Sequence, residues 1–118
     1  MKLKSVFATL VVLGSLASCA HLDPHPMDMS SAIRNAKTKA DHNALAKHYE
    51  DAAKKMQEKA QIQKNRLAEY EGHSYYYGRV TEDLKEHTKA LARLYEEAAE
   101  ANRKLAEAQR QMADQAKE

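Results

Sequence analysis

Residues that can bind a metal gather in a short segment near the N-terminus. This segment, residues 21–29, contains His21, His25, Met27 and Met29. Imidazole nitrogen suits copper and zinc, and thioether sulfur suits copper. A flexible segment loses conformational entropy when it binds, so such a site would be weak. The same segment also suits a polar spacer, and we expect no bound metal or other cofactor.

Aromatic residues that can form a contact surface lie in the middle of the chain. Three consecutive tyrosines and a nearby arginine occur around two glycines, Gly72 and Gly78: Tyr75, Tyr76, Tyr77 and Arg79. Tyrosine offers a large surface with few rotatable bonds, which suits protein recognition. At least one of the three is expected to be exposed. Either the tyrosines bind a partner, or they fold back and cap the end of the helices.

The single cysteine follows a short apolar segment. Lys2 and Lys4 precede apolar residues 6–16, and the segment ends in Leu16-Ala17-Ser18-Cys19. A positive start, an apolar run too short to span a bilayer and small residues before a cut point are typical of a secretory signal. The tetrapeptide resembles the lipobox of bacterial lipoprotein precursors.

This resemblance implies a signal peptide over residues 1–18 and a mature chain that starts at Cys19. It also implies a diacylglycerol on the Cys19 sulfur and a third acyl chain on its amine. Two or more chains hold a protein stably at a bilayer. Ala20 after the cysteine is typical of delivery to the outer membrane, so the implied location is the periplasmic face of that membrane.

The mature chain is formally neutral and lacks familiar catalytic motifs. Loss of Lys2 and Lys4 lowers the basic residues from 19 to 17, which equals the 17 acidic residues. Nucleic-acid binding needs a basic excess, and none remains. The sequence has no glycine-rich phosphate loop, Gly-x-Ser-x-Gly or His-Glu-x-x-His. We therefore expect neither an enzyme nor a nucleic-acid-binding protein.

The elements that must position these residues are helices. Pro24 and Pro26 disfavour helix, so residues 19–29 are predicted to form a flexible tether. Residues 30–118 are rich in Ala, Lys, Glu, Gln and Leu, which favour helix. Gly72 is a stop signal, and Thr81 is a start signal. We predict an all-α fold, in which helices at about 31–71 and 82–116, joined by a loop over 72–80, form a long antiparallel hairpin.

Each predicted helix has an apolar stripe with spacings of three and four residues. The two stripes include Leu45, Met56, Ala60 and Leu67, and Leu84, Leu91, Leu105 and Met112. Residues that face each other are predicted to have numbers that sum to about 151. Polar residues in the stripes are predicted to pair and fix the register: Gln63 with His87, and Tyr49 with Asn102. His42 and His48 are predicted to lie on solvated flanks.

The two helices share a sequence repeat. Residues 44–53 match residues 90–99 at most positions, which predicts a duplicated helix with two equivalent arms. Two helices alone enclose little core. We therefore predict that two hairpins pair into a four-helix bundle, or that the hairpin docks on another protein.

The body is loosely similar to small alanine-rich helical outer-membrane lipoproteins of the murein-linked type. It differs from them in its central break and in its last residue, Glu118, where that type has a lysine. We expect a membrane-anchored structural or protein-interaction module of the cell envelope. The alternative is a periplasmic protein that binds copper or zinc or buffers stress through its histidines and methionines.

Overall fold

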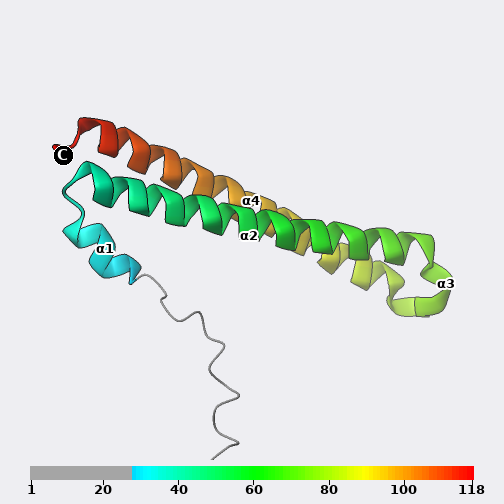
Figure 1. The fold of residues 1–118 in the computed structure, drawn as a ribbon. Helices are drawn as coiled ribbons and strands as arrows, with labels where there is room; N and C mark the ends of the chain where they lie inside the picture. Colours follow the sequence, from blue (N-terminus) through cyan, green and yellow to red (C-terminus); the bar gives the residue numbers. More distant parts are fainter. Residues whose placement is uncertain (1–27) are drawn as a thin grey trace, which may run out of the picture.

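The computed structural model describes residues 28–118, which form an all-α hairpin (Figure 1). The long helices α2 (Lys39–Gly72) and α4 (Thr81–Gln115) lie side by side and run in opposite directions. A short helix α1 (Met29–Asn35) precedes α2. The turn is made of α3 (Ser74–Tyr77) and the 3₁₀ helix η2 (Gly78–Val80). The predicted antiparallel hairpin is confirmed, and each arm is about 50 Å long.

The helix predicted over residues 31–71 is interrupted near its start. α1 ends at Asn35, and α2 begins at Lys39 after Thr38. Thr38 Oγ1 accepts a hydrogen bond from the Asp41 N–H at 3.1 Å, and the Asp41 carboxylate accepts one from the Thr38 N–H at 2.9 Å. This reciprocal cap satisfies N–H groups that have no partner within the helix, so it starts a new helix at this point.

The Asp41 carboxylate is held by more than its own helix. It also accepts a hydrogen bond from the Lys37 N–H at 3.0 Å. The hydrogen bonds from the backbone of Lys37 and of Thr38 favour the ionised carboxylate, so they lower the pKa of Asp41 below its ordinary value of 3.8. The break between α1 and α2 is therefore fixed most firmly when Asp41 is charged.

Alanines form most of the interface between α2 and α4. The buried alanines recur every seven residues on both helices: Ala46, Ala53 and Ala60 on α2, and Ala92, Ala99, Ala106 and Ala113 on α4. A seven-residue interval keeps one line of side chains toward a partner helix. Small side chains allow the axes to approach the lower end of the usual 8–10 Å separation. We call these two lines the alanine seam.

The seam follows the sequence repeat and the predicted register. Ala46 and Ala53 occupy the positions in the first copy that Ala92 and Ala99 occupy in the second, and all four are buried. Near the open end of the hairpin, His42 Nδ1 lies 2.8 Å from Gln109 Oε1, in the register that the sequence predicts. The Lys39 N–H donates to the Lys117 carbonyl oxygen at 3.2 Å and closes this end, which we call the base.

The apolar stripe predicted for α4 is wrong at several positions. Leu91, Leu105 and Met112 are 42%, 46% and 47% exposed, and His87 is also exposed. Each of these four residues comes one position before a buried one: Thr88, Ala92, Ala106 and Ala113. α4 thus carries two stripes offset by one residue. The smaller side chains face α2, because they allow the closer approach.

Candidate functional site

The tip of the hairpin is a tight helical turn that one glycine makes possible. Gly78 has φ 61° and ψ −135°, a backbone conformation that is unfavourable for residues other than glycine. The hydroxyl of the buried Thr81 lies 2.7 Å from the Gly78 carbonyl oxygen and 3.0 Å from that of Ser74, and can donate to either. These contacts fix the short helix that carries the tyrosines. The predicted loop over 72–80 is therefore ordered as helical turns.

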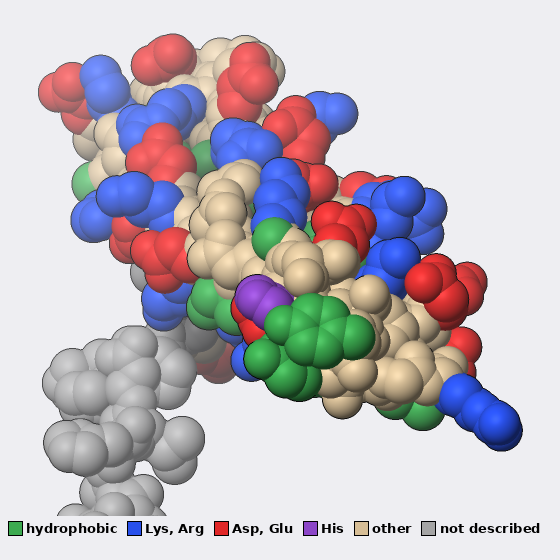
Figure 2. All heavy atoms as spheres, turned by 90° about the vertical axis from the view of Figure 1, so that its right-hand side faces the viewer, with side chains coloured by type: hydrophobic (Ala, Val, Ile, Leu, Met, Phe, Trp, Pro, Cys, Tyr) green, Lys and Arg blue, Asp and Glu red, His purple; other side chains and the backbone are tan. Residues whose placement is uncertain are grey.

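The three tyrosines differ in exposure. Tyr75 and Tyr76 are 71% and 70% exposed, and their ring centroids lie 4.2 Å apart. Tyr77 is half-buried and turns back, with its ring edge-on to Tyr70 at 5.0 Å. Figure 2 views this end of the hairpin, where hydrophobic side chains and a histidine gather together. Tyr75 and Tyr76 are thus an exposed pair of rings, while Tyr77 packs back against the end of α2.

Neighbouring groups raise the pKa values of Tyr75 and Tyr77 above the ordinary value of a phenol. A hydrogen bond with Tyr76 raises the pKa of Tyr75, and partial burial together with the Glu69 charge raises that of Tyr77. Glu69 Oε1 accepts a hydrogen bond from the Tyr77 hydroxyl at 3.5 Å and lies 3.1 Å from Nδ1 of His73.

Residues close to the tyrosines in the sequence are also exposed or half-buried. The imidazole of His73 is stacked on Tyr76 with centroids 5.7 Å apart. Arg79 is exposed in η2, and Val80 beside it is 54% exposed. We call His73, Tyr75, Tyr76, Arg79 and Val80 the tip surface. The sequence pattern indicated the tyrosines and Arg79 but not His73 or Val80.

The predicted polar pairs of the seam are partly wrong. Gln63 is buried, but His87 is exposed and cannot face it, because Thr88 occupies the buried position. Tyr49 and Asn102 are both half-buried, and the Asn102 side-chain amide donates to the Ala98 carbonyl oxygen of its own helix at 2.8 Å. The pairing of Tyr49 with Asn102 is therefore not among the hydrogen bonds of the described residues.

The buried histidine of the seam is His42, which the sequence analysis placed on a solvated flank. His42 is 7% exposed and forms its hydrogen bond with Gln109 across the seam. His48 is half-buried, with its ring edge-on to Tyr49 at 5.9 Å. The signal for His42 is its spacing of four residues from Ala46, which places both on the same face.

Most of the predicted N-terminal sites lie outside the described residues. These are the lipidation site Cys19 and the metal ligands His21, His25 and Met27. Met29 is the first residue of α1, where the sequence analysis predicted tether. Within residues 28–118, no cluster of three His, Cys, Asp or Glu side chains is arranged to hold a metal ion. None of the helices in this range has the length and apolar character needed to cross a bilayer.

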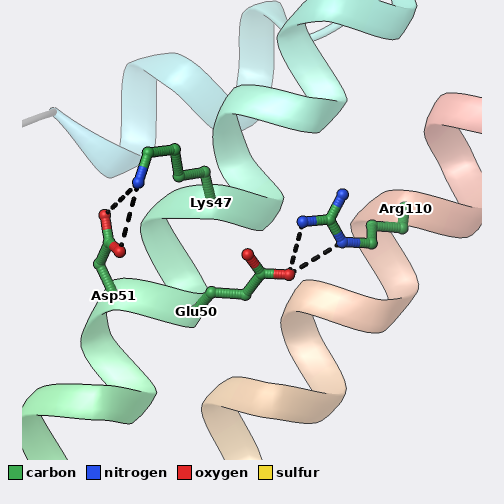
Figure 3. A network of polar contacts seen from close by, with 4 residues as sticks. All are labelled: Lys47, Glu50, Asp51 and Arg110. Atoms are coloured by element: carbon green, nitrogen blue, oxygen red, sulfur yellow. Dashed lines mark hydrogen bonds and ion pairs between the residues drawn. The ribbon is translucent and has the colours of Figure 1, made fainter.

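The two sides of the hairpin differ in chemistry. On one side, ion pairs join the helices. Arg110 Nε donates to Glu50 at 2.9 Å (Figure 3), and Lys64 pairs with Glu96. Figure 3 also shows the pair between Lys47 and Asp51 within α2, at 3.1 Å. We call the side that carries the two interhelical pairs the charged flank.

Large apolar side chains lie on the opposite side. On α4, Glu96 follows Tyr95 and Arg110 follows Gln109, and both of these preceding residues are half-buried. Leu91, Leu105 and Met112, in contrast, each precede an alanine of the seam. Positions that follow and positions that precede an interface line project to opposite sides of it. Leu94 of α4, 54% exposed, and Ile62 of α2, 49% exposed, lie two residues after Ala92 and Ala60 on the same outer side. We call these five residues the leucine flank.

Comparison of the chain with protein-family models, with curated proteins and with solved structures found no match in any of the three.

Proposed function

We propose that this chain is a lipid-anchored lipoprotein of the bacterial cell envelope, in which the hairpin holds a protein-binding tip away from the membrane. One observation carries the proposal. Tyr75 and Tyr76 are about 70% exposed at the end of the hairpin farthest from α1 (Figure 1). Aromatic side chains supply much of the contact energy in protein interfaces, so an exposed pair on an ordered turn favours recognition.

The geometry suits a spacer. α2 is 34 residues long, which corresponds to about 50 Å, and it runs from the base to the tip without a break. The chain enters the hairpin at the base through α1, so an anchor at Cys19 would leave the tip at the far end. A partner that lies some distance from the bilayer is the expected target of such an arrangement.

The tip is tested by serine substitution in the full-length chain. Envelopes from cells that express the wild type or Tyr75→Ser/Tyr76→Ser are treated with a chemical crosslinker, and adducts with other proteins are quantified by mass spectrometry. We expect the double variant to lose most of its heterologous adducts, about tenfold, with no change in helical circular dichroism. Ile33→Ser, an exposed apolar residue of α1, is the matched control and should keep them. Equal adduct yields for the two variants would show that the tip is not the contact site.

The anchor is tested separately. Mass spectrometry of the N-terminal peptide should find Cys19 as the first residue, carrying acyl chains. Cys19→Ser should move the chain from the membrane fraction to the soluble fraction. A native chain that keeps residues 1–18, or one with an unmodified Cys19 thiol, would refute the lipoprotein proposal.

A further inference from the structure

The leucine flank has the pattern of a second helix interface that the hairpin leaves open. Along α4, apolar side chains and one histidine recur with alternating spacings of three and four residues: Leu84, His87, Leu91, Leu94, Ala98, Ala101, Leu105, Ala108 and Met112. Alternation of three and four is the spacing of a helix–helix seam. Four of these side chains, Leu91, Leu94, Leu105 and Met112, are 42–54% exposed. The pattern therefore indicates that another helix packs on this side of α4.

The size of this surface matches a stable dimer. The face formed by two adjacent arms is about 50 Å long and about 18 Å wide, from the helix rise and the usual interaxial distance. Its footprint is thus about 900 Å², against about 800 Å² per partner in a standard protein interface. The alanine seam buries few large side chains, so a second interface of this size adds the apolar burial that the hairpin lacks.

The charges beside the leucine flank differ between the two arms. On this side, α2 carries the exposed basic residues Lys55, Lys59 and Arg66, followed near the tip by the exposed acidic residue Glu69. The outer edge of the α4 stripe carries the exposed acidic residues Asp83 and Glu97 and, one heptad after Glu97, the exposed basic residue Lys104. Neither Lys55 nor Arg66 forms an ion pair within residues 28–118. Glu97 has a loose contact with Arg93 of its own helix, at 3.8 Å. The middle of the face, around Lys55 and Glu97, is therefore complementary to itself when α4 of one copy covers α2 of another.

We propose that two copies of this chain pack through their leucine flanks into a four-helix bundle, with α4 of each copy on α2 of the other and both tips at the same end. A two-fold axis parallel to the helices produces this arrangement and makes the interface identical for both copies. It also makes every neighbouring pair of helices antiparallel, as in an up-down bundle.

The register of the hairpin specifies the contacts. His42 and Gln109 lie opposite each other, and their residue numbers sum to 151. Along the rest of the hairpin, an α2 residue and an α4 residue therefore lie at the same height on the helix axis when their numbers sum to about 151. Rotation about a two-fold axis parallel to the helices does not move residues along the axis, so the same relation of residue numbers holds between α4 of one copy and α2 of the other. Glu97 then lies within one residue of the level of the partner's Lys55. Asp83 lies between the levels of the partner's Arg66 and Glu69, so its surroundings are mixed in charge. The pair of Glu97 with Lys55 combines opposite charges, which steer association and fix orientation.

The opposite orientation, with the tips apart, is less favourable. There, α4 packs on α4 of the other copy around Ala98, which brings Glu97 close to its own counterpart. Lys55 and Arg66 then face no acidic edge of α4. Like charges across an interface suppress the wrong arrangement. The charge pattern therefore selects the arrangement with the tips together, which also allows both chains to be anchored in one membrane.

Cysteine crosslinking in the full-length chain tests the contacts. Two differently tagged copies are expressed together, one with Glu97→Cys and the other with Lys55→Cys, and the envelopes are oxidised. We expect a mixed disulfide dimer in at least tenfold greater yield than with Glu50→Cys and Arg110→Cys placed in separate copies, since the charged flank faces outward. A self-crosslink of Ala98→Cys would overturn the orientation, because these positions lie on diagonal helices of the proposed bundle, too far apart for a disulfide.

Charge and apolar variants test the association itself. In the full-length chain purified in detergent, sedimentation should give twice the monomer mass. Leu94→Glu should weaken association at least tenfold without loss of helicity, because Leu94 is already 54% exposed in the hairpin. Ile33→Glu is the matched control and should leave the dimer intact. Glu97→Lys should weaken it, and Lys55→Glu in the same chain should restore it.

The results separate this proposal from the proposed function, on which it does not rest. A dimer that survives Tyr75→Ser/Tyr76→Ser but not Leu94→Glu supports the leucine flank, whatever the tip binds. A wild-type chain that sediments as a monomer would overturn the inference. So would a dimer unaffected by Leu94→Glu, or a leucine flank that crosslinks only to a different protein.

Discussion

The two stripes of α4 lie about 100° apart, one residue along the helix, and they differ in what covers them. The alanine seam is closed by α2, and each of its α4 alanines is at most 5% exposed. The second stripe, which runs from Leu84 to Met112 and which we call the leucine stripe, is open, because Leu91, Leu94, Leu105 and Met112 are 42–54% exposed. The side chains with the most apolar surface are thus outside the hairpin, and those with the least are inside.

This inversion shows that fit, rather than hydrophobicity alone, selects the seam. Burial of apolar surface contributes about 25 cal/mol per Å², so leucines would gain more by burial than alanines. They would also hold the helices farther apart. Alanines at seven-residue intervals on both arms match one another in size and register, and the leucines are left for a different contact.

The largest effect is expected from a leucine placed inside the seam. Ala99 is fully buried, so Ala99→Leu forces the arms apart and should lower the free energy of unfolding by about 3 kcal/mol, at the upper end of overpacking costs. Ala108→Leu is the matched control, since Ala108 is exposed on the leucine stripe. Urea unfolding followed by circular dichroism measures both. If the two variants were equally stable, the distinction between the stripes would fail.

A smaller effect is expected where the seam is polar. Gln109→Leu removes the partner of His42, which stays buried without its hydrogen bond, and should cost about 1–2 kcal/mol. In the double variant His42→Leu/Gln109→Leu neither polar group remains, so much of the loss should be recovered. The same unfolding experiment on the wild type, the two single variants and the double variant gives the coupling. Additive losses would show that the two side chains do not act as a pair.

Much of the fold could be predicted because its signals are local. The absence of Gly and Pro from residues 30–71 and the two glycines near the tyrosines specify two long arms and a turn. The register also followed, since a short connection leaves little freedom in how antiparallel arms align. His42 and Gln109 confirm it at the base.

The stripe on α4 was mispredicted because two patterns with the same period overlap on it. A search for apolar residues favours Leu91, Leu105 and Met112, since alanine adds little to an apolar stripe. The decisive signal was the seven-residue recurrence of alanine on both arms, from Ala46 and from Ala92. It has meaning only when the two helices are considered as a pair. The break before α2 could not be predicted for a different reason. Thr38 and Asp41 can lie inside a helix as well as form its N-terminal cap, and no Gly or Pro marks the break.

At the tip, the residue types could be predicted from the sequence, but which tyrosines are exposed and which one is half-buried could not. Three adjacent tyrosines cannot all share one environment, but which of them turns back depends on the conformation of the turn. Gly78 at positive φ and the buried Thr81 set that conformation. They direct Tyr77 toward Tyr70 and leave Tyr75 and Tyr76 in solvent.

The smallest effect is expected at the base, where the cap of α2 adjoins the seam. Because hydrogen bonds from the backbone lower the pKa of Asp41 below 3.8, its ionised form stabilises the cap. That contribution is fully present above pH 3.8, the ordinary value that also applies to the unfolded chain, and is lost as the pH falls through the lower folded-state pKa. NMR titration should therefore show the Lys37 and Thr38 amide signals moving with a midpoint below 3.8.

Asp41→Asn is the matched variant for this titration. It keeps a side-chain oxygen that can accept a hydrogen bond but has no charge to titrate, so the pH-dependent movement of the Lys37 and Thr38 signals should disappear. The signals of Ala53 and Ala99 should stay unchanged in both proteins, since the alanine seam contains no carboxylate. Movement of the seam signals with the same midpoint would mean that the cap holds the arms together, and the seam would then not be sufficient by itself.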